Sequence, residues 1–401
     1  MNRRAKPEDV GRRARAPKPQ PLPTPAPGFE SPQKLLETYR PDIAKALAAA
    51  GSPFYRQDQV CEHLFRRPMQ TFLQATALPA RMRQLLDGLG ASSLAPAGKR
   101  TAADGTTKLL LAGRDGSYVE TVIMPYRKRI TVCLSSQVGC PVGCGFCATG
   151  AMGFRRNLSV AEIVDQVRAA AALAAEGDGR ISNLVFMGMG EPLLNLQAVL
   201  GSIRVLADPR GLNLGHRSIS VSTVGFPAGI IRLGRTEPQV NLALSLHAST
   251  DSTRSLLVPK SYCHPLSEIL AAAWEHFAMT HRKLLVEYVL LRGVNDSVED
   301  ARRLAALLRG HVVTVNLISW NPVPEAAQER AIRAGRASDP RPHSAAPSTF
   351  QPSPPATVAV FRDTLHDARI EAVVRQGKGA EIQAACGQLA GRRQAYDQVA
   401  R

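Results

Sequence analysis

The sequence lacks two features that mark membrane and secreted proteins. It contains no run of about 18 apolar residues, the length that a membrane-spanning helix needs. Its first stretch is basic and holds no apolar core segment, which excludes a secretory signal at that position. We therefore expect a cytoplasmic protein without membrane contact, whose thiols are kept reduced.

Acidic residues are also scarce relative to basic ones. The chain has 33 Asp and Glu residues against 50 Lys and Arg residues, a formal net charge of +17 and a pI near 10.1. A GC-rich genome would explain the preference for arginine, but not the excess of cations. The charge is typical of a protein that binds a polyanion, and it favours a nucleic acid as partner.

The length of 401 residues suggests two or three domains, and composition divides the chain further. The first residues are rich in Arg, Lys, Pro and Ala and cannot bury an apolar face, whereas a late stretch rich in Pro, Ala and Ser follows no period. We expect a disordered basic arm (1–28), an N-terminal helical RNA-binding domain (29–104), a β-hairpin linker (105–129), a barrel core (130–322), a flexible insertion (323–356) and a C-terminal segment (357–401).

Local patterns predict the elements that precede the barrel. Apolar residues recur at helical spacing over residues 35–47 and again over residues 57–72. Residues 108–111 and 118–124 alternate in polarity on either side of Asp115-Gly116, which predicts a β-hairpin.

From residue 130 onward, predicted strands alternate with predicted helices. The strands are residues 130–135, 182–186, 218–222, 240–246, 284–291 and 312–318, and the helices include 160–175, 196–206, 266–277 and 298–308. A last helix (357–368) and strand (371–375) follow the insertion. Six repeats indicate parallel strands with right-handed crossovers. The fold class is therefore α/β, a partial (β/α)6 barrel, because a full barrel needs eight repeats.

Three cysteines, Cys140, Cys144 and Cys147, follow the first barrel strand at the spacing C-x3-C-x2-C. Three thiolates can hold an iron–sulfur cluster and leave one iron free to bind a small molecule, typically S-adenosylmethionine. A structural zinc site with Cys133 or Cys263 as fourth ligand is the alternative. A disulfide is disfavoured, because these cysteines crowd on one loop and the total of seven is odd.

Polar residues follow several other predicted strands, at the rim where a barrel carries its chemistry. Gly190 lets the backbone approach a ligand closely, and Glu191 can bind an ammonium group. The other candidates at this rim are Ser222, Ser245, Leu246, His247 and Asn321. Each also has a structural interpretation, as a cap, a turn former or a hydrogen-bonded core histidine. Their convergence on one rim favours a binding site.

The remaining cysteines are ambiguous from the sequence. Cys133 lies in the first barrel strand and Cys386 near the C-terminus. A free cysteine is most often a small buried hydrophobe. Cys61 and Cys263 have no supporting context, and we assign them to structure.

Together these motifs closely resemble the radical S-adenosylmethionine RNA methyltransferases of the RlmN type, to which the Cfr enzymes are related. The matching segments are residues 119–125, 133–140, 146–147, 156–158, 187–194, 221–225, 242–248, 293–296 and 384–391. The resemblance implies a radical SAM barrel with a [4Fe–4S] cluster on Cys140, Cys144 and Cys147, and with Phe146 beside the cofactor. The implied contacts to S-adenosylmethionine come from Gly190, Glu191, Ser222, Ser245, Leu246, His247 and Asn321.

The family reaction implies roles for three further residues. Cys386 would carry the methyl group as S-methylcysteine, made from one S-adenosylmethionine. A second is cleaved to the 5′-deoxyadenosyl radical, which takes hydrogen from that methyl group. The new carbon radical adds to C2 of adenine, a carbon that is not nucleophilic. Cys133 would help remove the C2 proton and resolve the protein–RNA link through a transient disulfide with Cys386, and Glu120 matches a family proton acceptor.

The implied partners are 23S rRNA at the peptidyl-transferase centre, tRNA at the adenosine 3′ of the anticodon, and an electron donor such as flavodoxin or ferredoxin. The chain departs from the family in two places. Residues 325–355 replace a short family segment, and Glu381 stands where aspartate is common. A Cfr-like enzyme that methylates C8 is one alternative. A non-catalytic, metal-stabilised RNA-binding protein is another, of a different class.

Overall fold

The structure is a computed structural model, which describes residues 28–67, 70–127, 129–177, 179–259, 262–323, 350–375, 377–391 and 396. Almost all of the predicted basic arm and most of the predicted insertion lie outside these described residues. Within the described part, no helix is both long enough and apolar enough to cross a membrane.

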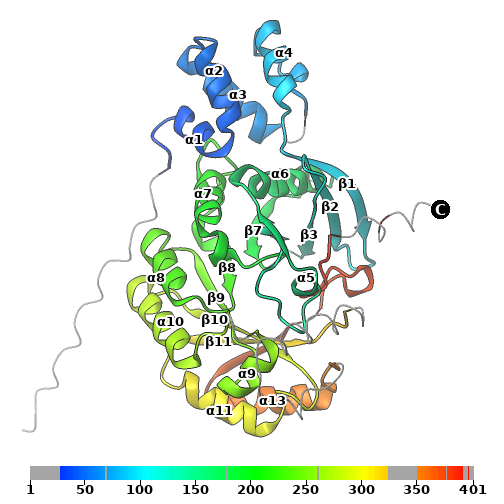
Figure 1. Cartoon of the computed structure of the whole chain (residues 1–401), viewed down its shortest axis with the longest axis vertical. Coiled ribbons are helices and arrows are strands. Elements are labelled where there is room, and N and C mark those ends of the chain that lie inside the picture. The colour runs from blue at the N-terminus through cyan, green and yellow to red at the C-terminus, as the bar shows by residue number, and fades with distance from the viewer. Residues whose placement is uncertain are drawn as a thin grey trace, which may run out of the picture.

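The N-terminal part is helical, as its periodicity predicted (Figure 1). Its elements are α1 (Pro32–Tyr39), α2 (Pro41–Ala49), α3 (Phe54–Arg66), the 3-10 turn η1 (Phe72–Gln74) and α4 (Ala80–Leu89). The prediction of one helix over residues 57–72 was too long, since α3 ends at Arg66. Pro68 follows in the sequence, and the residue before a proline is biased away from helical conformation.

The predicted hairpin is part of a larger antiparallel unit. The strands β1 (Leu94–Thr101), β2 (Thr107–Gly113), β3 (Tyr118–Tyr126) and β4 (Arg129–Cys133) pair in chain order. Strand β1 was not predicted and lies within the segment expected to be helical. It contains Pro96 and Gly98, two residue types that weaken a strand pattern, and its register shifts between them.

The parallel part confirms the partial barrel. Its strands are β7 (Ile181–Phe186), β8 (Ile219–Thr223), β9 (Asn241–Ser245), β10 (Leu284–Leu290), β11 (Val313–Ser319) and β12 (Glu371–Arg375). The sheet order is β1-β2-β3-β4-β7-β8-β9-β10-β11-β12, with parallel pairing from β4 to β12. Since β1 and β12 stand at opposite ends of this order, the sheet is open. Strand β4 is the first of the parallel strands, so β12 brings their number within the described residues to seven, one more than the six predicted repeats.

Helices cover the outer side of the curved sheet (Figure 1). They are α6 (Val160–Glu176), α7 (Leu196–Ala207), α8 (Pro227–Thr236), α10 (Leu266–Thr280), α11 (Val298–Leu308) and α13 (Pro355–Asp367). Short elements fill the connections: β5 (Gln137–Gly139), β6 (Phe154–Asn157), α5 (Ala148–Ala151), α9 (Asp251–Leu257), η2 (Pro192–Asn195), η3 (His216–Ser218) and η5 (Ala380–Ile382).

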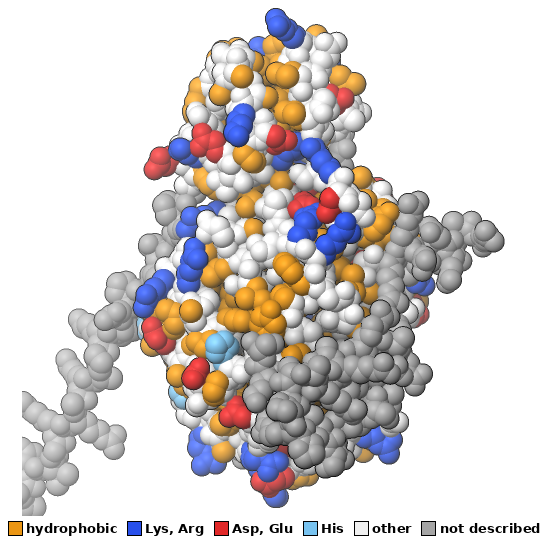
Figure 2. Space-filling model, viewed as in Figure 1, with side chains coloured by type: hydrophobic (Ala, Val, Ile, Leu, Met, Phe, Trp, Pro, Cys, Tyr) orange, Lys and Arg blue, Asp and Glu red, His pale blue; other side chains and the backbone are white. Residues whose placement is uncertain are grey.

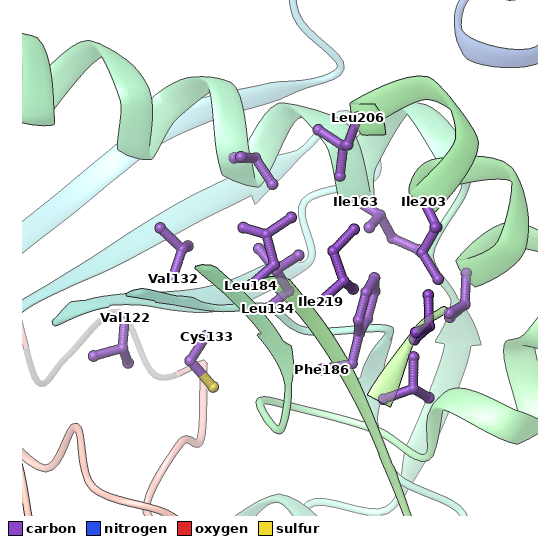
Figure 3. Close-up of a cluster of buried hydrophobic side chains, with 14 of the residues drawn as sticks. Val122, Val132, Cys133, Leu134, Ile163, Leu184, Phe186, Ile203, Leu206 and Ile219 are labelled. Carbon is purple, nitrogen blue, oxygen red and sulfur yellow. The ribbon is translucent and has the colours of Figure 1, made fainter. Parts of the chain in front are cut away.

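The main core lies between the sheet and these helices. Leu184 and Phe186 of β7 and Ile219 of β8 pack near Ile163 of α6 and Ile203 of α7 (Figure 3). All five side chains are almost fully buried. This packing fixes the strands from outside, so that their C-terminal ends can carry loops for chemistry.

Candidate functional site

A cavity opens at the C-terminal ends of the parallel strands. It holds about 970 Å³ of empty space, a volume that includes open solvent. Ten of the residues predicted from sequence line it: Cys140, Cys144, Cys147, Gly190, Glu191, Ser222, Ser245, His247, Asn321 and Cys386. Three others, Leu246, Cys133 and Glu120, are not among the lining residues.

The cysteine loop runs from the end of β5 to α5 and is held by backbone contacts. The amide of Cys140 donates to the carbonyl of Gly153, and the amide of Gly145 donates to the carbonyl of Leu257 in α9. The loop also packs tightly against Gly150, where an added Cβ would lie 2.8 Å from the backbone nitrogen of Cys144. The sequence therefore presents three thiols to the cavity from one compact turn.

Burial raises the pKa of all three cluster-loop thiols, that of Cys140 to about 12. A metal overcomes such a penalty, because it binds the thiolate form and its positive charge favours deprotonation. Among the described residues, no three His, Cys, Asp or Glu side chains are placed to hold a single metal ion. A four-iron cluster is wider than one ion, so three soft donors around a shared cavity fit it better.

The zinc alternative required a fourth thiol at the same place. Neither Cys133 nor Cys263 lines the cavity that the three loop cysteines share. Cys263 instead accepts a hydrogen bond from Arg254 Nη1 at 3.2 Å. The structure therefore places neither of the two predicted fourth ligands at this cavity, where the one further cysteine among the described residues is Cys386.

Glu191 lies at the base of the cavity, on the turn after β7. Its amide donates to Gln137 Oε1 at 2.8 Å, and its carboxylate accepts from the amides of Leu193 and Val224, both at 3.0 Å. Burial raises its pKa to about 7. Gly190 beside it has φ of +100°, and a Cβ there would lie 2.6 Å from the Gln137 side chain. The turn therefore needs glycine and holds one buried carboxyl in a fixed orientation.

The C-terminal ends of β8 and β9 supply neutral polar groups to the same cavity. The hydroxyls of Ser222 and Ser245 lie 3.0 Å apart. His247 has φ of +59°, a strained conformation for a residue other than glycine, and its Nδ1 accepts from the amide of Val289 at 3.2 Å. Burial lowers the pKa of His247 to about 3, so its ring is neutral. The ring packs edge-on against Phe146, with centroids 4.9 Å apart.

Leu246 differs from its neighbours, because its side chain is fully buried in the core. Its amide donates to the carbonyl of Glu287 at 3.1 Å. Its carbonyl accepts from Arg254 Nε at 3.2 Å, so the second lone pair of that carbonyl is what its backbone can offer to a ligand.

A second cavity adjoins the first and contains the other two thiols of interest. Cys133 and Cys386 both line it, together with Tyr126, Arg375 and Lys378. It encloses about 770 Å³ of empty space and shares Met187, Ile318, Asn321, Cys386 and Leu389 with the first cavity. Burial raises the pKa of Cys133 to about 12. Cys386 thus stands between the cluster-loop cavity and a second space that is bordered by cationic side chains.

The third predicted catalytic residue, Glu120, lies away from both cavities. It is 1% exposed on β3 and pairs with Lys108 Nζ at 3.0 Å. The structure thus brings the two predicted catalytic cysteines to one space and places the predicted catalytic carboxylate in a buried ion pair.

Two residues of the site, Glu287 and Trp320, were not predicted from the sequence. Glu287 lines the first cavity from the middle of β10, is almost fully buried and accepts from Asn316 Nδ2 at 2.8 Å. It is the only charged residue in the apolar stretch 284–291, a signal that could have identified it. Trp320 also lines the cavity and donates to the carbonyl of Phe146 at 2.9 Å. Nothing in its local sequence marked it.

Comparisons with known proteins agree with this geometry. Residues 134–305 match the Radical SAM superfamily. The chain is 40% identical over 351 residues to the dual-specificity RNA methyltransferase RlmN of Syntrophobacter fumaroxidans, covering 87% of this chain and 95% of that protein. It is 43% identical over 340 residues to a probable RlmN of Gloeobacter violaceus, covering 84% and 90%. The crystal structure of a radical SAM methyltransferase from Sphaerobacter thermophilus matches with a TM-score of 0.79 and 42% identity, over 87% and 96%.

The open sheet and the cavity lined by three loop cysteines define a radical SAM protein, which uses a [4Fe–4S] cluster and S-adenosylmethionine. Sequence identity of 40% or more to these two relatives, over most of the chain, is specific enough to identify one family within the radical SAM proteins. The chain belongs to the RlmN family of dual-specificity RNA methyltransferases.

Proposed function

We propose that this protein methylates C2 of adenine in 23S rRNA, at the peptidyl-transferase centre, and in tRNA, at the adenosine 3′ of the anticodon. Cys386 carries the methyl group and Cys133 resolves the intermediate. The observation that supports this most directly is that both thiols line one cavity, which shares Cys386 and four other lining residues with the cavity of the cysteine loop.

The first cavity provides the cofactor site of the proposal. Cys140, Cys144 and Cys147 ligate the cluster. S-adenosylmethionine is held by Gly190, Glu191, Ser222, Ser245, the backbone of Leu246, His247 and Asn321. When bound, the two cofactors would supply a carbon-centred radical in this cavity. Two molecules of S-adenosylmethionine are used in each turnover.

Two residues of the rim have definite tasks. The carboxyl of Glu191, oriented by the amides of Leu193 and Val224, faces the ammonium group of the bound cofactor. The ring of His247 is neutral, because burial lowers its pKa to about 3. It therefore adds no charge that would repel the sulfonium.

The two thiols act in sequence. The Cys386 thiolate takes the methyl group from a sulfonium and leaves S-adenosylhomocysteine. After that carbon has bonded to C2, the ring gives up its C2 proton and one electron, which the oxidised cluster would accept. The Cys133 thiolate then attacks the Cys386 sulfur and forms a disulfide. The electron pair of the broken sulfur–carbon bond passes into the adenine ring, and the released methylene carbon takes up a proton to become the methyl group. An added reductant then restores both thiols. Burial raises the pKa of Cys133, which keeps this thiol protonated until the substrate is in place.

Positively charged side chains near the second cavity and on the surface support RNA as the partner. Adenine C2 is reached only after the base is unstacked from folded RNA. Arg375 and Lys378 border the second cavity, and Lys378 Nζ also lies 5.1 Å from the ring centroid of Tyr126. Figure 2 shows further Lys and Arg side chains spread over the N-terminal helices and the barrel. The N-terminal domain grips the RNA in this proposal, and a flavodoxin or ferredoxin in the cytoplasm supplies the electron.

The test is the identity of the product. RNA from a strain that lacks the gene is incubated anaerobically with reconstituted protein, and its nucleosides are separated by mass spectrometry. We expect 2-methyladenosine in both rRNA and tRNA, and none with Cys386→Ser. Formation of 8-methyladenosine would support the Cfr-like alternative, and RNA binding without any methylation would support the non-catalytic one.

A further inference from the structure

A buried ion pair lies beneath the C-terminal segment, outside both cavities. Lys108 of β2 and Glu120 of β3 are joined at 3.0 Å between Nζ and Oε1, and each side chain is 2% exposed. Removing two charges from water costs free energy that their mutual attraction barely repays. The ion pair therefore stabilises the fold little more than two apolar side chains of the same shape would. Its role is indicated by the other groups to which Lys108 and Glu120 are hydrogen-bonded.

Both members of the pair bind the segment that carries Cys386. Lys108 Nζ donates to the carbonyl of Gln383 at 3.0 Å. Glu120 Oε2 accepts from the amides of Ala390 at 2.7 Å and Gly391 at 3.1 Å. The pair thus contacts the chain three residues before Cys386 and again four and five residues after it.

Tyr396 secures the same segment farther along. Its hydroxyl donates to Glu120 Oε1 at 2.9 Å, and Lys108 Nζ lies 5.4 Å from its ring centroid. The ring packs directly on Gly98 of β1, where an added Cβ would lie 2.7 Å from Tyr396 Cδ1. All contacts of Glu120 in this group are charge-assisted, a class about twice as strong as neutral hydrogen bonds.

The loop between these anchors has no regular structure to define its shape. Gln383 and Gly387 both have positive φ, and η5 ends at Ile382. Asn321 Nδ2 donates to the carbonyl of Cys386 at 3.2 Å from the barrel rim. The middle of the loop is also held, since the amide of Ala148 donates to the carbonyl of Gly387 at 2.7 Å and Thr149 Oγ1 donates to the carbonyl of Leu389 at 2.6 Å. The position of the thiol therefore depends on these contacts together with those that hold the two ends of the loop.

We propose that the Lys108–Glu120 pair is a clamp that positions the Cys386 loop against the barrel rim. The inference rests on the proposed carrier role of Cys386 for its functional meaning. It also assigns Glu120 as a positioning residue instead of the proton acceptor that the family resemblance implies. Both carboxylate oxygens are occupied by protein donors, and the side chain reaches neither cavity.

The test removes both charges at once, because a single uncompensated charge in this place could unfold the protein. Lys108→Met/Glu120→Gln is compared with Lys283→Met/Glu371→Gln, which removes an exposed ion pair of the same sheet, 2.7 Å long. Hydrogen exchange of the holoenzyme is followed by mass spectrometry over residues 384–391. We expect the amides of residues 384–391 to exchange about tenfold faster in the clamp variant, the factor that corresponds to one lost charge-assisted hydrogen bond. The exchange rates of the core strands are expected to stay unchanged. Unchanged exchange in the folded clamp variant would overturn the proposal.

Two further measurements separate positioning from other roles. Methylation of Cys386 at saturating S-adenosylmethionine is expected to slow about tenfold in the clamp variant, while the affinity for S-adenosylmethionine is kept. Lys108→Arg, which retains the charge and a donor for Gln383, is expected to restore both rates. If Glu120 is instead a proton acceptor, the Lys108→Met/Glu120→Gln variant will slow only steps after RNA attachment and leave loop exchange unchanged.

The outcomes also distinguish this proposal from the proposed function. Faster loop exchange together with RNA methylation by Cys386→Ser would retain the clamp and remove the carrier role. Unchanged exchange together with an inactive Cys386→Ser would retain the carrier role and remove the clamp.

Discussion

Cys133, the last residue of β4, and Cys386, near the C-terminus, line the same cavity although most of the barrel separates them in sequence. Figure 3 shows the Cys133 sulfur pointing away from the apolar cluster formed by its neighbours Val132 and Leu134. Both are free thiols. The fold thus places a buried thiol beside an accessible one, the arrangement that thiol–disulfide exchange requires.

The first prediction follows from this pairing. In the proposed reaction, the sulfur–carbon bond between Cys386 and the base has no attacking thiol once Cys133 is removed. Cys133→Ala is therefore expected to accumulate RNA bound covalently to protein, with turnover reduced at least about 100-fold, as for loss of a covalent-catalysis partner. A denaturing gel of the anaerobic reaction shows the adduct. Cys61→Ala, a buried cysteine in α3, is the control and should release free RNA.

The second prediction concerns the cluster ligands. Cys144→Ala is expected to lose the broad iron–sulfur absorbance and to fall from about four bound irons per chain to nearly none, because two thiolates hold such a cluster poorly. Cys263→Ala should keep both, since Cys263 does not line the cavity. Iron and zinc are measured by elemental analysis after anaerobic purification. Stoichiometric zinc that depends on Cys263 would instead support a structural metal site.

The third prediction concerns stability in mild acid. His276 on α10 is 1% exposed, and its Nε2 has no hydrogen-bond partner within the described residues. Burial lowers its pKa from the ordinary 6.5 to about 4. The neutral ring is favoured in the fold, so its stabilising effect is complete above pH 6.5 and is lost as the pH falls toward 4. The corresponding loss is about 3 kcal/mol.

His276→Leu should therefore show a shallower decrease in the free energy of unfolding between these pH values than the unchanged protein. Urea denaturation at several pH values measures the difference. The exposed His311, changed to Gln, serves as control and should leave the slope as it was. Equal slopes for His276→Leu and the unchanged protein would rule out this assignment.

Sequence patterns predicted much of the barrel because each strand is a short apolar run and each helix has a regular apolar face. They missed β1, because Pro96 and Gly98 obscure its alternation and only pairing with β2 makes it a strand. The cysteine spacing and the rim turns predicted most of the first cavity. Each of these motifs is a short stretch of sequence, and the ends of parallel strands meet at one rim. The roles of Glu287 and Lys108 depend on strands and loops far apart in the chain, which a single sequence does not bring together.

The last prediction tests how the N-terminal helices are joined to the barrel. Arg168 on α6 is fully buried and donates from Nε to the carbonyl of Leu64 at 2.8 Å, and from Nη1 to Asp165 at 2.7 Å and Tyr39 at 2.8 Å. Arg168→Met leaves Asp165 as an uncompensated buried charge. We expect a loss of about 3–5 kcal/mol in the free energy of unfolding. Arg302→Met, which removes an exposed pair on α11, should change it by less than about 0.5 kcal/mol. Urea denaturation gives both free energies of unfolding. Hydrogen exchange should show faster opening of α1 and α3 in Arg168→Met. Equal stability of the two variants would show that this network does not join the N-terminal helices to the barrel.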